Sequence, residues 1–149
     1  MTTTQATIYQ NLLTYLETHC TLDNTVPVDV GCAEAVSFIL QKSGVAGLPL
    51  TGIAGTATLY ERLLANPHFK RIYAPEPGAL IISPTGYGYG PIQGHTGFVG
   101  KYGKMYSGDF GIVSNDSNTG LLLELWDVKR WQKYYGLQGG LPVAFFRAL

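Results

Sequence analysis

A cysteine and a histidine carry the chemistry that this sequence can be expected to perform. Cys32 follows Gly31 and opens a segment whose apolar residues have helical spacing. A thiol at the start of a helix faces the positive end of the helix dipole, which favours the thiolate and predicts a lowered pKa. Gly31 leaves the backbone open to a substrate carbonyl, and the unpaired N–H groups of the first helical turn predict an oxyanion hole. The alternative is a buried core cysteine, which is a common place for this residue type.

His95 is the candidate base, because it follows Gly94 at the start of a predicted strand. Strand alternation places His95, Gly97 and Val99 on one face, where Gly97 would leave room for an approaching helix end. The alternative is a histidine that bonds to a loop carbonyl and has no catalytic role. The other two histidines are expected at the surface or at helix ends. The three histidines have no HxH, HExxH or i,i+4 spacing, so no metal site is predicted.

A third residue is expected to orient the imidazole of His95, as in other catalytic triads. The next predicted strand ends in a polar run, and in a meander that end returns to the start of the previous strand. Asn115 and Asp116 are both candidates for this role. The residue types alone leave the choice between them open. The alternative is an ordinary turn rich in Asx residues.

Helical periodicity dominates the first half of the chain. Threonines before the first helix can cap it, and Gly44 is the expected stop of the second. Residues 21–31 read as a loop between them. The expected helices span residues 6–19, 32–43 and 56–65.

The period becomes strand-like after Phe69, with turns expected at residues 75–78 and 101–104. A short helix at 127–135, capped by Asp127, should place Trp131 and either Tyr134 or Tyr135 inward. Pro142 favours a sheet edge for the last strand. The expected strands span residues 70–73, 79–83, 95–100, 110–114 and 142–147. Helices followed by an antiparallel sheet predict an α+β fold.

Composition narrows the class of protein. The 149 residues fit one domain, spanning 1–149, and 46% hydrophobic against 13% charged residues is typical of a globular fold. Basic and acidic residues are ten each, so neither a nucleic acid nor a membrane is predicted as a partner. No apolar run approaches the roughly 20 residues that span a bilayer. The two cysteines are too few for a disulfide framework.

Three motifs in order resemble the CHAP and NlpC-type hydrolases, which are papain-like enzymes of bacterial and phage cell-wall turnover. They are a Gly31-Cys32 helix start, a Pro77-Gly78 turn before an apolar strand, and a Gly94-His95 strand start. The resemblance covers roughly residues 30–116. It implies a papain-like fold with N-terminal helices on an antiparallel sheet. The sequence departs from the NlpC pattern in having Gly31 where an aspartate is usual. Asn115 stands where CHAP domains have glutamate, so the resemblance favours Asn115 over Asp116 as the third residue, and an amide can orient an imidazole without adding charge. We therefore expect Asn115→Ala to slow the reaction more than Asp116→Ala.

The resemblance implies that the substrate is peptidoglycan, cut at an amide bond by an endopeptidase or amidase without a cofactor. Tyr87, Tyr89 and Tyr102, together with the glycines of residues 86–94, are expected to border the substrate groove. One alternative is a papain-like deamidase or toxin that acts on proteins, because the same Cys and His pair serves both chemistries. Another is a non-catalytic, wall-binding structural module of a phage particle.

The N-terminus has no basic region followed by an apolar one, so no secretory signal peptide is predicted. We therefore expect synthesis in the cytoplasm, with action on the wall after release, after injection, or as part of a virion. A phage endolysin freed by a holin would fit this expectation. An injected antibacterial effector would also fit, and it would require an immunity protein that blocks the Cys32–His95 groove.

Overall fold

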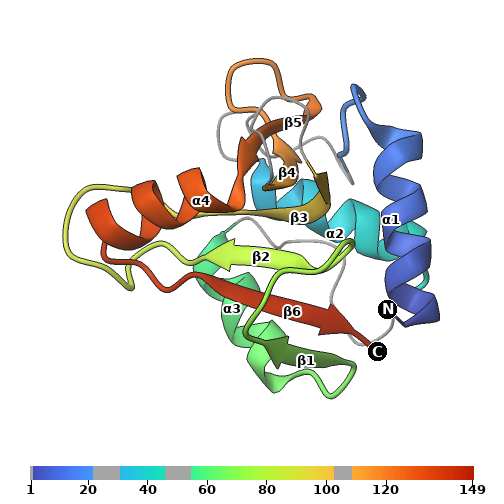
Figure 1. Cartoon of the computed structure of the whole chain (residues 1–149), viewed down its shortest axis with the longest axis horizontal. Helices are drawn as coiled ribbons and strands as arrows, with labels where there is room; N and C mark the ends of the chain where they lie inside the picture. Colours follow the sequence, from blue (N-terminus) through green and yellow to red (C-terminus); the bar gives the residue numbers. More distant parts are fainter. Residues whose placement is uncertain (1, 22–30, 46–54, 103–108) are drawn as a thin grey trace.

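The computed structural model describes residues 2–21, 31–45, 55–102 and 109–149, with only the backbone of Tyr102 (Figure 1). Within these ranges the strands form one antiparallel six-stranded sheet, in the order β1-β6-β2-β3-β4-β5. The strands are β1 (Phe69–Ile72), β2 (Leu80–Ser83), β3 (His95–Tyr102), β4 (Phe110–Asn115), β5 (Leu122–Asp127) and β6 (Ala144–Ala148). Helices precede the sheet, so the predicted α+β class is confirmed.

Three α-helices form where the first half of the sequence predicts them: α1 (Thr3–Tyr15), α2 (Cys32–Lys42) and α3 (Thr56–Ala65). Thr2 caps α1, because its hydroxyl accepts a hydrogen bond from the N–H of Gln5 at 3.0 Å. Gly44 follows α2 with φ of +72°, a conformation that glycine adopts without strain. Residues 22–30 of the predicted loop at 21–31 lie outside the described residues.

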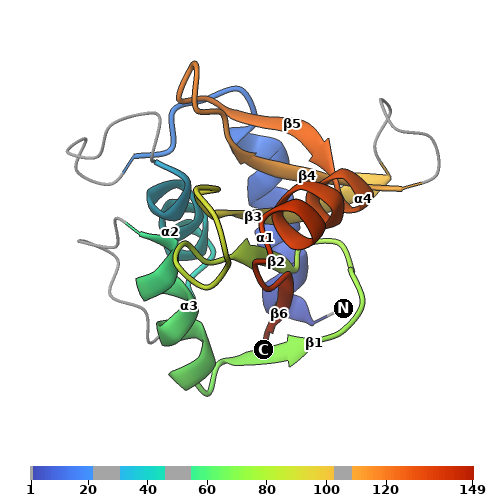
Figure 2. The same cartoon turned by 90° about the vertical axis from the view of Figure 1, so that its left-hand side faces the viewer.

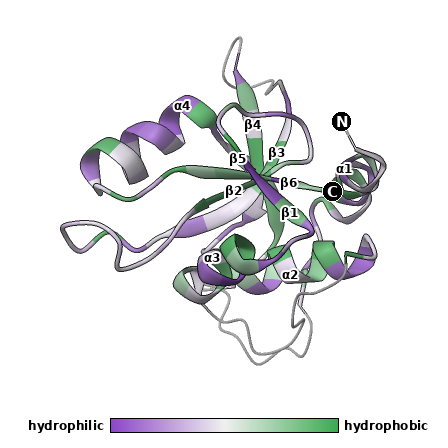
Figure 3. Cartoon of the chain, turned by 90° about the horizontal axis from the view of Figure 1, so that it is seen from below, coloured by the Kyte–Doolittle hydropathy of each residue, from purple (hydrophilic) through white to green (hydrophobic). Residues whose placement is uncertain are grey.

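Helices cover the sheet on both faces. Figure 3 shows α2 and α3 on one side of the strands and α4 (Val128–Trp131) on the other. Phe98 of β3 packs into the core shared with α1, α2 and α3, whereas Val99 packs into the core beneath Trp131. The predicted alternation along β3 is therefore confirmed. It means that the side chain of His95 belongs to the face covered by α4.

The C-terminal third differs from the sequence prediction in three ways. β5 was not predicted, and it extends the predicted meander of β3 and β4 by one strand. The predicted helix at 127–135 becomes α4 followed by the π-helix η2 (Gln132–Gln138). The prediction of an edge position for the last strand is wrong, because β6 lies between β1 and β2. Pro142 precedes β6, so it removes no hydrogen bond from the ladder.

Lys101 and Tyr102, which were predicted to begin a turn at residues 101–104, instead continue β3. Residues 103 and 104 lie outside the described part of the chain. Tyr102 pairs with Phe110 and closes β3 at the end opposite His95. The seven residue steps from His95 to Tyr102, at about 3.3 Å each, put that end roughly 23 Å from His95.

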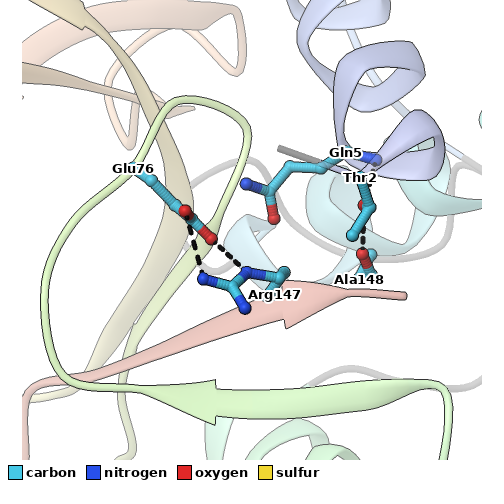
Figure 4. A network of polar contacts seen from close by, with 5 residues as sticks. All are labelled: Thr2, Gln5, Glu76, Arg147 and Ala148. Carbon is cyan, nitrogen blue, oxygen red and sulfur yellow. Dashed lines mark hydrogen bonds and ion pairs between the residues drawn. The ribbon is translucent and has the colours of Figure 1, made fainter.

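The turn before β2 anchors the N-terminal helix to the sheet (Figure 4). Glu76 pairs with the guanidinium of Arg147, whose hydrogen bonds hold the pKa of Glu76 below its usual range. The hydroxyl of Thr2 donates to the carbonyl of Ala148 at 2.6 Å. Gly78 has φ of +82°, and a Cβ there would lie 2.6 Å from the carbonyl oxygen of Gln5. The Pro77-Gly78 turn thus serves the close packing of α1.

Candidate active site

Cys32 is the first residue of α2 and is half-buried. No side chain caps this helix, and Gly31 before it is buried and accepts a hydrogen bond from the N–H of Ala35. Backbone N–H groups of Thr96, Ala33 and Cys32 itself face the sulfur and favour the thiolate. Burial has the larger effect, however, and raises the pKa of the thiol above its ordinary value. The predicted lowering of this pKa is therefore wrong, because the effect of desolvation exceeds the stabilisation of the thiolate by the N-terminus of the helix.

Cys20 lies in different surroundings from Cys32. Its side chain is 4% exposed within the core that α1 and α2 share with the sheet. Its sulfur lies 3.7 Å from the hydroxyl of Thr18, and burial raises its thiol pKa. Neither of the two described cavities near Cys32 and His95 is lined by Cys20. Cys20 thus has the position of a structural core residue.

His95 opens β3 and is held by Ser114 and Trp131. Its Nε2 lies 3.0 Å from the hydroxyl oxygen of Ser114. Its ring stacks on Trp131, with centroids 5.2 Å apart and planes 25° from parallel. The Trp131 Nε1–H donates to the hydroxyl of Ser83 at 3.0 Å, which fixes the indole under the imidazole. Burial lowers the pKa of His95 to about 4, against an opposing effect from the charge of Asp116, so the ring is neutral at pH 7.

Strand register explains why Ser114 contacts His95. The β3–β4 pairing sets Ser114 beside Gly97, where a Cβ on Gly97 would lie 2.8 Å from the Cβ of Ser114. The space left by Gly97 is therefore occupied by β4, and the expectation that it admits a helix end is wrong. Ser114 was not predicted as the partner of His95. The sequence does hold a signal for this contact. Ser114 lies two residues after Ile112 in β4, and alternate residues of a strand point to the same face of the sheet.

The two predicted third residues lie near His95 without the hydrogen bond to its Nε2. Asn115 is buried and Asp116 half-buried, and both line a cavity of about 100 Å³ beside His95. The carboxylate of Asp116 accepts hydrogen bonds from the N–H and the hydroxyl of Thr119, at 3.1 and 2.7 Å. Its charge is felt by His95. A catalytic role for either residue stays a prediction.

A second cavity of about 340 Å³ lies on the Cys32 side of β3. The residues that line it are mostly small: Cys32, Gly55, Thr56, Ala57, Thr85, Gln93 and Gly94. Gly94 and His95 are neighbours in sequence, so the two cavities flank the start of β3. Cys32 and His95, both within the described residues, form no hydrogen bond with each other.

Thr85 closes the base of the loop between β2 and β3. Its N–H donates to the hydroxyl of Thr56 at 2.9 Å, and its own hydroxyl accepts from the N–H of Gly94 at 2.8 Å. A Cβ on Gly94 would lie 2.0 Å from the carbonyl oxygen of Ser83, so only glycine fits there. The loop end that precedes His95 is therefore fixed by backbone contacts.

The tyrosines that were expected to border the groove hold this loop in place. The hydroxyl of Tyr87 donates to Glu61 of α3 at 3.0 Å. The hydroxyl of Tyr89 donates to the carbonyl of Leu137 at 3.2 Å, and its ring covers Gly140. Figure 2 shows the loop lying between α3 on one side and α4 on the other. Neither tyrosine lines the two cavities described above, and the side chain of Tyr102 lies outside the described part of the structure.

Two further observations bear on ligands. Within the described ranges, no three His, Cys, Asp or Glu side chains gather as metal ligands would. The described helices include none of the length and apolar character that crossing a bilayer requires. In comparisons with known proteins, no protein-family model and no curated sequence matches the chain.

Proposed function

We propose that the protein is a papain-like cysteine hydrolase, with Cys32 as nucleophile and His95 as base, and that it cleaves an amide bond of peptidoglycan. One observation carries the proposal. The N–H of Thr96, the residue after His95, faces the sulfur of Cys32. The start of α2 and the start of β3 therefore meet, which is the arrangement that the resemblance to CHAP and NlpC-type hydrolases implies for the nucleophile and its base.

The reaction begins with transfer of the thiol proton. Nε2 of His95 lies 3.0 Å from the hydroxyl oxygen of Ser114, and the mechanism uses the tautomer in which Nε2–H donates to that oxygen. The lone pair of Nδ1 is then free to accept the proton of Cys32. The sulfur attacks the amide carbon, and backbone N–H groups at the start of α2 stabilise the oxyanion. His95 then protonates the leaving amine. Water hydrolyses the thioester, which restores the free thiol.

The two pKa shifts favour a resting state without an ion pair. A raised pKa at Cys32 and a pKa of about 4 at His95 keep both groups neutral at pH 7. The thiol must then lose its proton as the carbon–sulfur bond forms, with His95 acting as a general base. A neutral imidazole is in the correct form for that step above about pH 4.

The choice of peptidoglycan rests on the resemblance of the three ordered motifs to CHAP and NlpC-type enzymes. The cavity lined by Cys32 is compatible with a peptide substrate, because small residues such as Gly55, Ala57 and Gly94 form its walls. Such a cavity suits an acyl group with a short side chain. The cavity on the His95 side is lined by the polar end of β4, Ser114 and Asn115.

Mass spectrometry of peptidoglycan fragments tests the function and names the bond that is cut. Purified sacculi are incubated with the native protein, with Cys32→Ser and with Cys20→Ala as matched control. We expect new amino and carboxyl ends with the native protein and with Cys20→Ala, and none with Cys32→Ser. Undiminished release by a folded Cys32→Ser protein would refute the nucleophile. If native protein releases nothing from sacculi but deamidates protein substrates, the toxin alternative replaces this proposal.

Where the protein acts is tested in bacterial cells. The chain is expressed with and without a fused export signal, and Cys32→Ser serves as control for each form. Lysis restricted to the exported form with Cys32 intact supports a wall substrate. Equal killing by the cytosolic form would place the target inside the cell.

A further inference from the structure

A tyrosine that the proposed mechanism does not use faces the same reaction centre. Tyr135 lies in the π-helix η2, on the face of the sheet that carries His95. Its ring stacks over the imidazole of His95, with centroids 6.0 Å apart and planes 25° from parallel. It also packs against Trp131, at 4.7 Å between centroids. These contacts leave the ring 7% exposed and fix its position.

Among the described residues, none accepts a hydrogen bond from the hydroxyl of Tyr135, and this hydroxyl is not one of the fully enclosed polar atoms. Tyr135 lines the cavity of about 100 Å³ beside His95. A phenol that is held by its ring, and that has no acceptor among the described residues, can donate a hydrogen bond to a group that enters the cavity.

Electrostatics link the same hydroxyl to the thiol. Burial raises the pKa of Tyr135, and the charge of the Cys32 thiolate raises it further, which requires the two groups to be near one another. The phenol is therefore protonated throughout the working pH range and can only donate to an anion. A π-helical turn is rare and often marks a functional site, and here it directs Tyr135 inward while Tyr134 is 40% exposed.

We propose that Tyr135 is a catalytic residue that donates a hydrogen bond to the oxyanion of the tetrahedral intermediate formed at Cys32. This rests on the proposed function only in that Cys32 attacks a carbonyl. The thiol proton passes to His95, the sulfur–carbon bond forms, and the carbonyl π electrons become the oxygen lone pair that Tyr135 stabilises. On collapse the carbonyl reforms and the bond to the leaving group breaks.

Two small reagents separate this role from a structural one. The ester p-nitrophenyl acetate acylates Cys32 through a tetrahedral oxyanion and releases p-nitrophenolate. Iodoacetamide alkylates the same sulfur by displacement of iodide and forms no oxyanion. Both rates are measured at Cys32 by peptide mapping in the native protein, in Tyr135→Phe and in Tyr134→Phe as matched control. The ratio of the two rates within one protein cancels any change in the folded fraction.

We expect Tyr135→Phe to slow acylation roughly 100-fold, as loss of one oxyanion donor does, while alkylation changes less than about twofold. Tyr134→Phe should change neither rate. An equal loss of both rates in Tyr135→Phe, or no loss of either, would overturn the proposal, as would a native Cys32 that is alkylated but never acylated. Neither reagent contains peptidoglycan. A failure to cleave sacculi would therefore contradict the proposed substrate but not the role of Tyr135 as an oxyanion donor.

Discussion

The two cavities beside the start of β3 differ in the residues that surround Cys32 in one and His95 in the other. Around Cys32 the walls are small residues and backbone N–H groups, which offer space and hydrogen-bond donors. Around His95 the walls are aromatic rings and the polar end of β4. Burial acts on both groups in the direction of the neutral form, raising one pKa and lowering the other. The comparison shows that burial alone can hold both a thiol and an imidazole in the neutral forms that general-base catalysis requires.

The largest effect is expected from removing the base. His95→Gln keeps a polar side chain of similar size near Ser114 but cannot accept the thiol proton. We expect the rate of amide cleavage to fall roughly 1000-fold, within the range that general base catalysis contributes. The measurement is kcat on peptidoglycan fragments, with a thermal melt to confirm folding. A folded His95→Gln protein with native kcat would remove His95 from the mechanism.

The aromatic wall should matter for stability far more than the exposed face of the same helical segment. Trp131 is fully buried against His95, so Trp131→Ala should lower the free energy of unfolding by about 3–5 kcal/mol. Leu137 is 77% exposed, and Leu137→Ala should change it by less than about 0.5 kcal/mol. Urea unfolding measures both. Similar losses at the two positions would contradict the packing described for this face.

Ser114 is expected to contribute through the orientation of His95. Loss of its hydroxyl in Ser114→Ala leaves Nε2 without its partner, and we expect kcat to fall about tenfold with little change in KM. Ser117→Ala, at an exposed position of the same cavity, is the matched control. If Asn115→Ala or Asp116→Ala lowers kcat more than Ser114→Ala, the orienting role belongs to that residue.

The depressed pKa of His95 predicts how stability depends on pH. Between pH 6.5 and about 4 the unfolded chain binds a proton at this residue that the folded chain does not. The contribution of His95 to stability is therefore complete above pH 6.5 and declines as the pH falls toward 4. Urea unfolding at several pH values should show this decline in the native protein and a shallower one in His95→Gln. Equal slopes in the two proteins would show that His95 is not desolvated.

Local signals in the sequence predicted the helices, whereas the strand order depends on long-range packing. The starts of α2 and α3 and the stop at Gly44 follow from neighbouring residues, so sequence sufficed. β5 and the central place of β6 depend on pairing between distant segments. Pro142 suggested a sheet edge because proline cannot donate a hydrogen bond to a neighbouring strand. The proline precedes β6, however, and lies outside its pairing.

The same division applies to the candidate site. Cys32 and His95 could be proposed from the sequence because each begins an element, which is a local property. Ser114 depends on the register between β3 and β4, and Tyr135 depends on a π-helical turn that α-helical periodicity does not describe. The direction of the Cys32 pKa shift also required the fold, because desolvation is set by what packs around the thiol. Contacts of this kind cannot be obtained from residue spacing.

Capture of the acyl-enzyme tests the account most directly. The native protein is mixed with peptidoglycan fragments, quenched in acid within the first turnover, and digested for peptide mapping. We predict a peptidoglycan acyl group in thioester linkage on Cys32, absent from His95→Gln under the same conditions. Continued release of fragments with no adduct on Cys32, or an adduct on Cys20 instead, would contradict a mechanism in which Cys32 is the nucleophile and His95 its base.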